Sequence, residues 1–310
     1  MNRKVLNFSL LLVLAMSLAS CKTASTACKE ILFTHSFVSG NGFEANIVAI
    51  CPDETSPRQI TTNGLLGNSK PYWSPDGSKI AYLSAGSGTR QLHLMDSDGS
   101  NDRQITSGSG LDVSEMMWLP DGNRIAMLVA EAGEWQWQAV DVLTGEITSL
   151  DAWAFQSDSI LSMSLSHDGT RFAHVVRANP EQANSPSELY IQDIDGSNPF
   201  VLANAKGIIE SPIWSPDDSQ IAFLSCGENA TCVEKNIYMI NTDGSNLHEL
   251  TTTDLDPWTI AWSPDGGSLA VIADDERYTG GVLYELDIKT GKRTALFKLE
   301  EPSMISRLSW

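Results

Sequence analysis

The chain has 310 residues, 42% hydrophobic and 19% charged, and its formal net charge is −19. Such an acidic surface repels phosphates and anionic headgroups, so the composition argues against a nucleic-acid-binding protein. The length is sufficient to bury a full hydrophobic core.

The first 20 residues have the pattern of a bacterial lipoprotein signal peptide. Arg3 and Lys4 form a basic start, and residues 5–18 form an apolar run that is too short for a lasting membrane span. The small residues before Cys21 resemble a lipobox. We therefore predict cleavage before Cys21, a lipid on Cys21 as the only membrane contact, and a tether over residues 21–28. The alternative is an ordinary signal peptide in which Cys21 has no special role.

Four further cysteines form an even set, as expected for an exported protein. Cys28 precedes one predicted strand and Cys51 ends the next, so an antiparallel hairpin would bring them together. Cys226 and Cys232 flank a short loop between two other predicted strands. We predict the disulfides Cys28–Cys51 and Cys226–Cys232. A metal site at the second pair is less favoured, because no other pair has zinc-ribbon spacing.

The motif Trp-Ser-Pro-Asp-Gly, or a variant of it, recurs along the rest of the chain. Its copies begin at Trp73, Trp118, Leu165, Trp214 and Trp262, and Trp310 stands where the next would begin. The steps between these positions are 45, 47, 49, 48 and 48 residues. A nearly constant period of this size indicates a repeat architecture.

Each repeat predicts four short antiparallel strands. In the first copy, an apolar segment ends at Trp73, and Pro-Asp-Gly supplies a tight turn. Strand-like runs follow at 80–83, 92–95 and 103–106, with an Asp-Gly turn before the last. Four strands at this period are typical of a β-propeller blade. A blade cannot bury both its faces alone, so we expect the repeated Trp to pack between blades.

The two ends of the repeat region complement each other. Residues 29–62 lack the Trp-ending strand, and residues 305–310 contain that strand alone. Pairing these segments would close the ring and remove an open sheet edge. We therefore predict one all-β domain over residues 29–310, a monomeric six-bladed β-propeller.

The amino-acid sequence of the repeat resembles that of TolB-type propellers. The resemblance rests on Trp-Ser-Pro-Asp-Gly-Ser-Lys-Ile-Ala-Tyr at 73–82, Asp-Ser-Asp-Gly-Ser-Asn at 96–101 and Arg-Gln-Ile-Thr at 103–106. It extends over about residues 29–310 and implies the propeller fold. The same repeat occurs in binding proteins, peptidase accessory domains and some polysaccharide lyases. TolB also has an N-terminal α/β domain, which we do not expect here, so TolB's own partners are not expected either.

Three Asp-Gly turns look like the opening of a calcium-binding loop, which would need a Glu at its twelfth position. These turns begin at Asp96, Asp193 and Asn241, and their twelfth positions hold Ser107, Asn204 and Thr252. We therefore predict hairpin turns, and neither a metal nor a cofactor. The histidines are spread over different repeats and no Gly-x-Ser-x-Gly elbow occurs, so no catalytic constellation is recognisable.

The central channel is the best place to look for a site. The residues three positions before each Trp position are all polar, namely Lys70, Glu115, Ser162, Ser211, Thr259 and Arg307. Their neighbours are apolar, and this alternation predicts that the polar set faces water in the channel. Lys70, Glu115 and Arg307 are the binding candidates. The alternative is that these charges are merely solvated at the channel mouth.

Trp135 and Trp137 form a second candidate, close to a loop. An exposed pair could stack on a sugar or a partner. Spacing of two residues puts both on one face of a strand, so packing against the next blade is equally natural.

These features predict a non-enzymatic lipoprotein of the bacterial cell envelope, at the periplasmic face or the cell surface. It would bind an envelope protein or peptide through a propeller face. The alternative is a carbohydrate-binding or lyase-type propeller that uses the central channel.

Overall fold

The computed structural model describes residues 28–40, 42–54, 56–86, 88–108, 110–131, 134–150, 153, 160–179, 185–229, 234–251, 255–275, 278–298 and 303–310. The predicted signal peptide and Cys21 lie outside these ranges. Within them, no helix combines the length and the apolar character that crossing a membrane requires.

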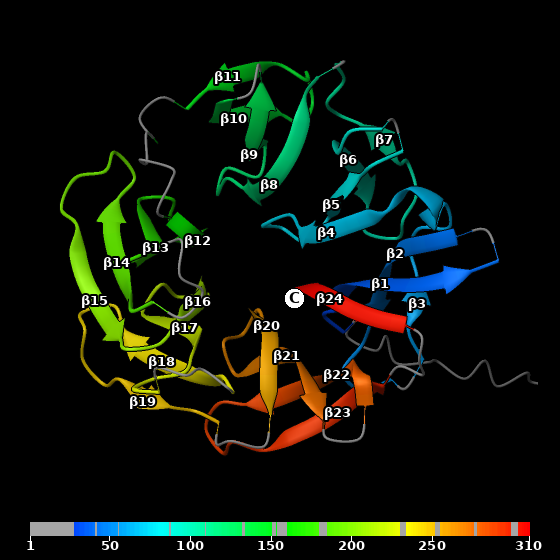
Figure 1. Ribbon diagram of the computed structural model, residues 1–310. Helices are drawn as coiled ribbons and strands as arrows, with labels where there is room; N and C mark the ends of the chain where they lie inside the picture. The colour runs from blue at the N-terminus through cyan, green and yellow to red at the C-terminus, as the bar shows by residue number, and fades with distance from the viewer. Residues whose placement is uncertain are drawn as a thin grey trace, which may run out of the picture.

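The described residues form six four-stranded antiparallel sheets arranged as blades around a centre (Figure 1). Blade 1 consists of β24 (Ser303–Ser309), β1 (Ile31–Ser39), β2 (Gly42–Ile50) and β3 (Arg58–Gln59). Blade 2 consists of β4 (Asn68–Trp73), β5 (Lys79–Ser84), β6 (Gln91–Asp96) and β7 (Arg103–Gln104). Blade 3 consists of β8 (Asp112–Trp118), β9 (Arg124–Glu131), β10 (Glu134–Asp141) and β11 (Ile147–Ser149).

The remaining blades follow the same order. Blade 4 consists of β12 (Ile160–Leu165), β13 (Arg171–Arg177), β14 (Ser187–Asp193) and β15 (Phe200–Ala205). Blade 5 consists of β16 (Ile209–Trp214), β17 (Gln220–Ser225), β18 (Asn236–Asn241) and β19 (His248–Glu249). Blade 6 consists of β20 (Asp256–Trp262), β21 (Ser268–Asp275), β22 (Tyr278–Asp287) and β23 (Arg293–Lys298). A 3-10 turn (Gly64–Leu66) precedes β4.

The last strand completes the first blade, as the sequence predicts. β24 lies innermost in blade 1 and pairs antiparallel with β1, from Leu32 opposite Ser309 to Phe37 opposite Ser303 (Figure 1). The fold is therefore the predicted six-bladed all-β propeller, and the closing blade is built from both ends of the repeat region.

The Ser-Pro-Asp-Gly turn motif recurs because its side chains and backbone form a local hydrogen-bond network. Ser74 Oγ donates to Asp76 Oδ1 at 2.6 Å and accepts from the Lys79 backbone N–H at 2.9 Å. Gly77 has φ +70°, a conformation that side chains other than glycine rarely adopt. The hydrogen bonds from Ser74 and Ser78 lower the pKa of Asp76 to about 2. The same Ser–Asp pair closes the turns of blades 4, 5 and 6.

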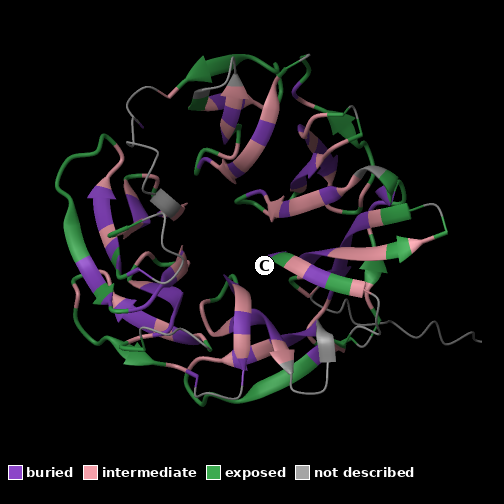
Figure 2. Ribbon diagram, viewed as in Figure 1, coloured by how far each residue is buried: buried purple, intermediate pink, exposed green. Residues whose placement is uncertain are grey.

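The repeated tryptophans join neighbouring blades. The indole N–H groups of Trp118, Trp214 and Trp262 donate to backbone carbonyls at 3.3, 3.2 and 3.3 Å. Each acceptor is the residue before the Trp position of the preceding blade, and these acceptors are Tyr72, Ser164 and Ile213. Figure 2 shows the buried residues concentrated within the blades, while outer strands are largely exposed.

The boundary between blades 3 and 4 is built differently. Leu165 stands at the Trp position of blade 4 and has no indole donor. Three aromatic rings fill this boundary instead. Trp153 lies 5.5 Å from Trp137 and 4.7 Å from Phe172, measured between ring centroids. Apolar packing here replaces the repeated inter-blade hydrogen bond.

Candidate functional site in the central channel

The inner strands of the blades surround a central cavity of about 1930 Å³. Every inner strand contains an irregularity at the position three residues before its Trp position or at the residue immediately before that one. The register with the neighbouring strand shifts between Ser69 and Tyr72, Val113 and Glu115, Ile160 and Ser162, Glu210 and Ile213, Pro257 and Thr259, and Ser306 and Leu308. Bulges of this kind redirect a side chain. Each repeat can therefore place one variable side chain at the channel wall, at the position three residues before its Trp position.

Three of these bulge residues have a left-handed backbone. Lys70, Ser211 and Arg307 have φ of +53°, +51° and +55°. A positive φ is uncommon for residues other than glycine, asparagine and aspartate. Its recurrence in blades 1, 2 and 5 shows that the conformation belongs to the architecture of the inner strand rather than to one site.

Five of the six residues predicted to face the channel do line the cavity. They are Glu115, Ser162, Ser211, Thr259 and Arg307. Lys70 differs from the prediction, because its side chain is only 11% exposed and lies in the wall. Its ammonium group pairs with the Glu115 carboxylate and donates to the Ser114 carbonyl at 2.6 Å. The neighbouring bulge supplies Glu115, and this pairing draws Lys70 away from water.

Burial lowers the pKa of Lys70, while Glu115 raises it and the charges of Arg307 and Arg90 lower it further. Tyr72 lies beside this pair and lines the cavity. Burial raises the pKa of Tyr72 to about 12, with the Glu115 charge adding to the effect and Arg307 opposing it. We call Lys70, Tyr72, Glu115 and Arg307 the wall cluster. It spans the inner strands of blades 1, 2 and 3.

Arg307 is the exposed member of the wall cluster. Within the described part of the chain, its guanidinium makes no hydrogen bond or ion pair. Arg90 behaves differently, because two of its nitrogens bind the Asp112 carboxylate at 3.0 and 2.6 Å. Arg307 is thus open to a ligand.

The side of the channel opposite the wall cluster carries further charged residues, which the sequence analysis did not identify. Arg177 and Glu210 both line the cavity, from β13 of blade 4 and β16 of blade 5. Lys235 Nζ donates to Glu210 Oε2 at 3.2 Å, so this carboxylate is paired. Only the ring geometry brings the end of β13 to the channel, and no periodic signal in the sequence marks Arg177. Tyr72 had a possible signal, since it directly precedes a repeated Trp.

The three Asp-Gly turns that resemble the opening of a calcium-binding loop use a carboxylate within the turn itself. Asp98 accepts from the Ser100 backbone N–H at 2.8 Å, and Asp195 and Asp243 make the same contact with Ser197 and Ser245 at 2.9 Å. These segments are hairpin turns, as predicted.

The two candidate tryptophans have different surroundings. Trp135 is 48% exposed, whereas Trp137 is partly buried and packs on Trp153. Both line the cavity near the boundary of blades 3 and 4. Trp137 therefore packs against the next blade, whereas Trp135 has the exposure that a surface site needs.

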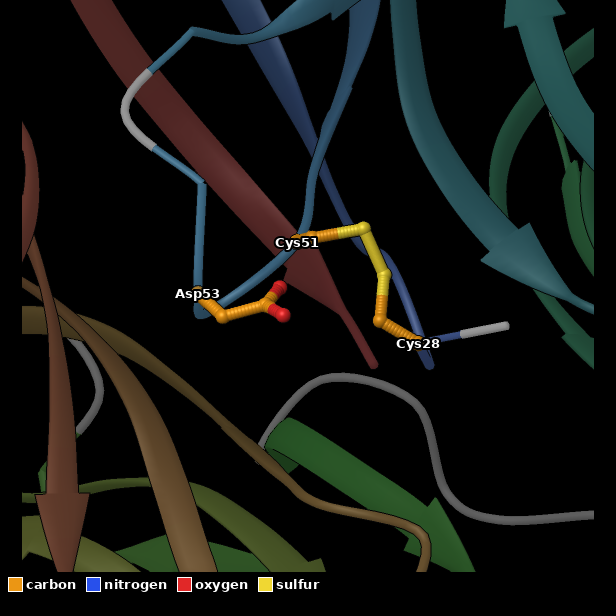
Figure 3. Close-up of side chains that lie close together, drawn as sticks. All are labelled: Cys28, Cys51 and Asp53. Atoms are coloured by element: carbon orange, nitrogen blue, oxygen red, sulfur yellow. A yellow bond between two sulfur atoms is a disulfide. The ribbon is translucent and has the colours of Figure 1, made fainter. Parts of the chain in front are cut away.

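The predicted disulfide Cys28–Cys51 is present, with a Cα–Cα distance of 5.9 Å. Figure 3 shows Asp53 beside the two sulfur atoms, within a group that has metal-ligand chemistry. Sulfur atoms bonded to each other cannot serve as thiolate ligands, so this group does not fit a metal ion. Cys232 lies outside the described residues, and the Cys226–Cys232 disulfide stays a prediction.

The histidines do not converge on the channel wall in a way that suggests catalysis. His174 stacks on Tyr190 with ring centroids 5.4 Å apart, and burial lowers its pKa to about 4. His93 lies near Asp102 and Tyr82 within blade 2. His167 bonds Asp218 of the next blade. Each has a structural contact within or between blades.

Comparison with known proteins supports the resemblance seen in the repeats. The family model for the lipoprotein LpqB β-propeller domain matches residues 61–194, which is less than half of the chain. TolB of the Tol-Pal system from Hamiltonella defensa is 45% identical over 56 residues, covering 18% of this chain and 13% of that protein. The resemblance to TolB-type propellers is confirmed.

Solved structures extend the likeness to the whole ring. TolB from Acinetobacter baumannii has a TM-score of 0.70 at 18% identity, over 91% of this chain and 66% of that one. An oligogalacturonate lyase in complex with manganese has a TM-score of 0.54 at 18% identity, over 88% of this chain and 74% of that one. At such identities these likenesses show the fold alone. The matches span less than two thirds of both TolB chains.

Proposed function

We propose that this protein is a non-enzymatic binding scaffold of the bacterial cell envelope, which holds a protein or peptide partner at the mouth and wall of its channel. The observation that carries the proposal is the recurring bulge of the inner strands. Six equivalent positions differ in side chain, and each lies at or directly after an irregularity of the inner strand. A rigid frame with variable residues at one surface is what a binding module needs.

The chemistry of the channel wall supports binding rather than catalysis. An enzyme needs an acid, a base or a nucleophile placed together around a reacting atom. The described wall instead offers the hydroxyl groups of Ser162, Ser211 and Thr259 together with charges, most of which are already paired. The similarity to TolB, whose name places it in the Tol-Pal system, agrees with a protein partner.

The envelope location rests on the similarity to a lipoprotein propeller family and on the N-terminal pattern before Cys21. Replacing Cys21 by Ser tests the anchor. We expect the wild-type chain in the membrane fraction, with the mobility shift of an acylated protein, and the variant in the soluble fraction. Equal membrane fractions for the two chains would contradict the lipid anchor.

Site-specific photocrosslinking in cells tests the partner. A crosslinking amino acid at Thr259 faces the channel, and the same amino acid at Thr294, exposed on the outermost strand β23, is the matched control. We expect a discrete protein adduct from Thr259 and none from Thr294, identified by mass spectrometry. Adducts of the same pattern from both positions would count against binding at the channel.

A further inference from the structure

The charge of the wall cluster is not balanced. Arg307 is exposed to the cavity and has no carboxylate partner among the described residues. Neighbouring cations do have one, since Lys70 pairs with Glu115 and Arg90 with Asp112. On the opposite side of the channel, Lys235 likewise pairs with Glu210 within blade 5. In a chain of net charge −19, acids are abundant, so an unpaired arginine inside the channel is unexpected.

The position of Arg307 adds to this imbalance. The charge of Arg307 lowers the pKa of Lys70, so two like charges act on one part of the wall. A second cation, Arg177, lines the cavity from blade 4, and its buried Nε has no hydrogen-bond partner in the described structure. An anion in the channel would lower the repulsion within the wall and satisfy donors that are otherwise unpaired.

The surface around the site is suited to a polypeptide. Each inner strand is the edge strand of its sheet, with a neighbour on one side only. Such an edge offers backbone N–H and C=O groups to an extended segment. Sugar recognition would favour an exposed aromatic ring close to the cation. The indole N–H groups at the Trp positions are instead committed to backbone carbonyls, in Trp73, Trp118, Trp214, Trp262 and Trp310. The exposed Trp135 lies on β10, the third strand of blade 3.

We propose that the channel binds an acidic peptide segment, with Arg307 as the anchor for a Glu or Asp carboxylate. This inference rests on the proposed binding function and specifies the partner's chemistry. The acidic outer surface repels such a segment elsewhere, so the unpaired Arg307 selects where it docks.

Fluorescence anisotropy with the purified full chain tests the proposal. The probe is a labelled peptide of alternating Ser and Glu, and the control probe is its Ser and Gln counterpart. Arg307→Asn removes the cation, and Asn tolerates the left-handed backbone at this position. Arg293→Asn, on the exposed outer strand β23, is the matched control. Circular dichroism and thermal melting verify that both variants fold.

We expect the Glu peptide to bind and the Gln peptide to bind much more weakly. Arg307→Asn should weaken Glu-peptide binding by about tenfold or more, the effect of losing one charge-assisted contact, while Arg293→Asn leaves it unchanged. Equal binding of the two peptides, or equal losses in the two variants, would overturn the proposal. So would an Arg307-dependent preference for tetragalacturonate over the Glu peptide. A partner crosslinked from Thr259 without any affinity for acidic peptides would leave the scaffold function intact and refute this inference alone.

Discussion

The contact between blades 4 and 5 at Asp218 offers a sharp test of what holds the ring together. Asp218 stands where the other complete turns have glycine, and its φ is +56°. Its carboxylate accepts from the backbone N–H groups of His167 and Asp168 at 2.8 and 2.9 Å, and lies 3.1 Å from His167 Nδ1. His167 in turn replaces the proline of the repeat. Two departures from the repeat therefore meet across one blade boundary.

Replacing Asp218 by Gly restores the repeat residue and relieves the left-handed backbone, which should stabilise the fold by about 1 kcal/mol. The change also removes three hydrogen bonds to a carboxylate. We count each at about 1 kcal/mol, below the usual range for charged groups, because His167 is more than half exposed. The net expectation is a loss of about 2 kcal/mol, although the new residue is the one that the turn itself prefers.

Equilibrium denaturation in urea, followed by both tryptophan fluorescence and circular dichroism, measures the change. The matched control is Gly122→Asp, which places the same side chain at the same turn position of blade 3, where a Cβ would meet nothing within 4 Å. That control should lose only about 1 kcal/mol, from backbone strain. The reasoning is refuted if Asp218→Gly is as stable as the wild type or more so.

Three further predictions concern the dependence of stability on pH and on the Cys28–Cys51 disulfide. The pKa of Asp76 is lowered from 3.8 to about 2 in the folded state, so its hydrogen bonds stabilise the fold above about pH 4 and this stabilisation is lost as the pH falls toward 2. Asp76→Asn should therefore make the free energy of unfolding less dependent on pH between about 4 and 2. Burial lowers the pKa of His174 to about 4 from 6.5, so the unfolded chain binds more protons and stability falls as the pH drops from about 6.5 to 4. A His174→Phe variant, which keeps an aromatic ring against Tyr190, should lose less stability than the wild type over that range, and parallel curves for the two proteins would speak against it. Removing the Cys28–Cys51 disulfide by a double Ser substitution should cost about 3 kcal/mol, from the 23-residue separation, and a midpoint equal to that of the oxidised wild type would contradict this.

Much of the fold follows from the sequence because its signals are local. The turn at Trp73 is closed by contacts between residues at most five positions apart, and the same Ser–Asp contact recurs in blades 4, 5 and 6. Strand alternation then sets which side chains face a neighbouring blade. The missing strand of residues 29–62 and the isolated strand before Trp310 predicted the closure that β24 and β1 make. The Cys28–Cys51 pair followed from the same hairpin logic.

The site required the tertiary structure, because its charges come from different blades. Lys70 and Glu115 are 45 residues apart, and only the ring brings their side chains into contact in the wall. That contact removes Lys70 from the channel and leaves Arg307 without a partner. Arg177 reaches the cavity from a strand that carries no channel-facing pattern, and Leu165 leaves one boundary to be filled by Trp153. Periodicity determined which residues form the blades, whereas the packing of one blade against the next decided which charges are paired and which are open to a ligand.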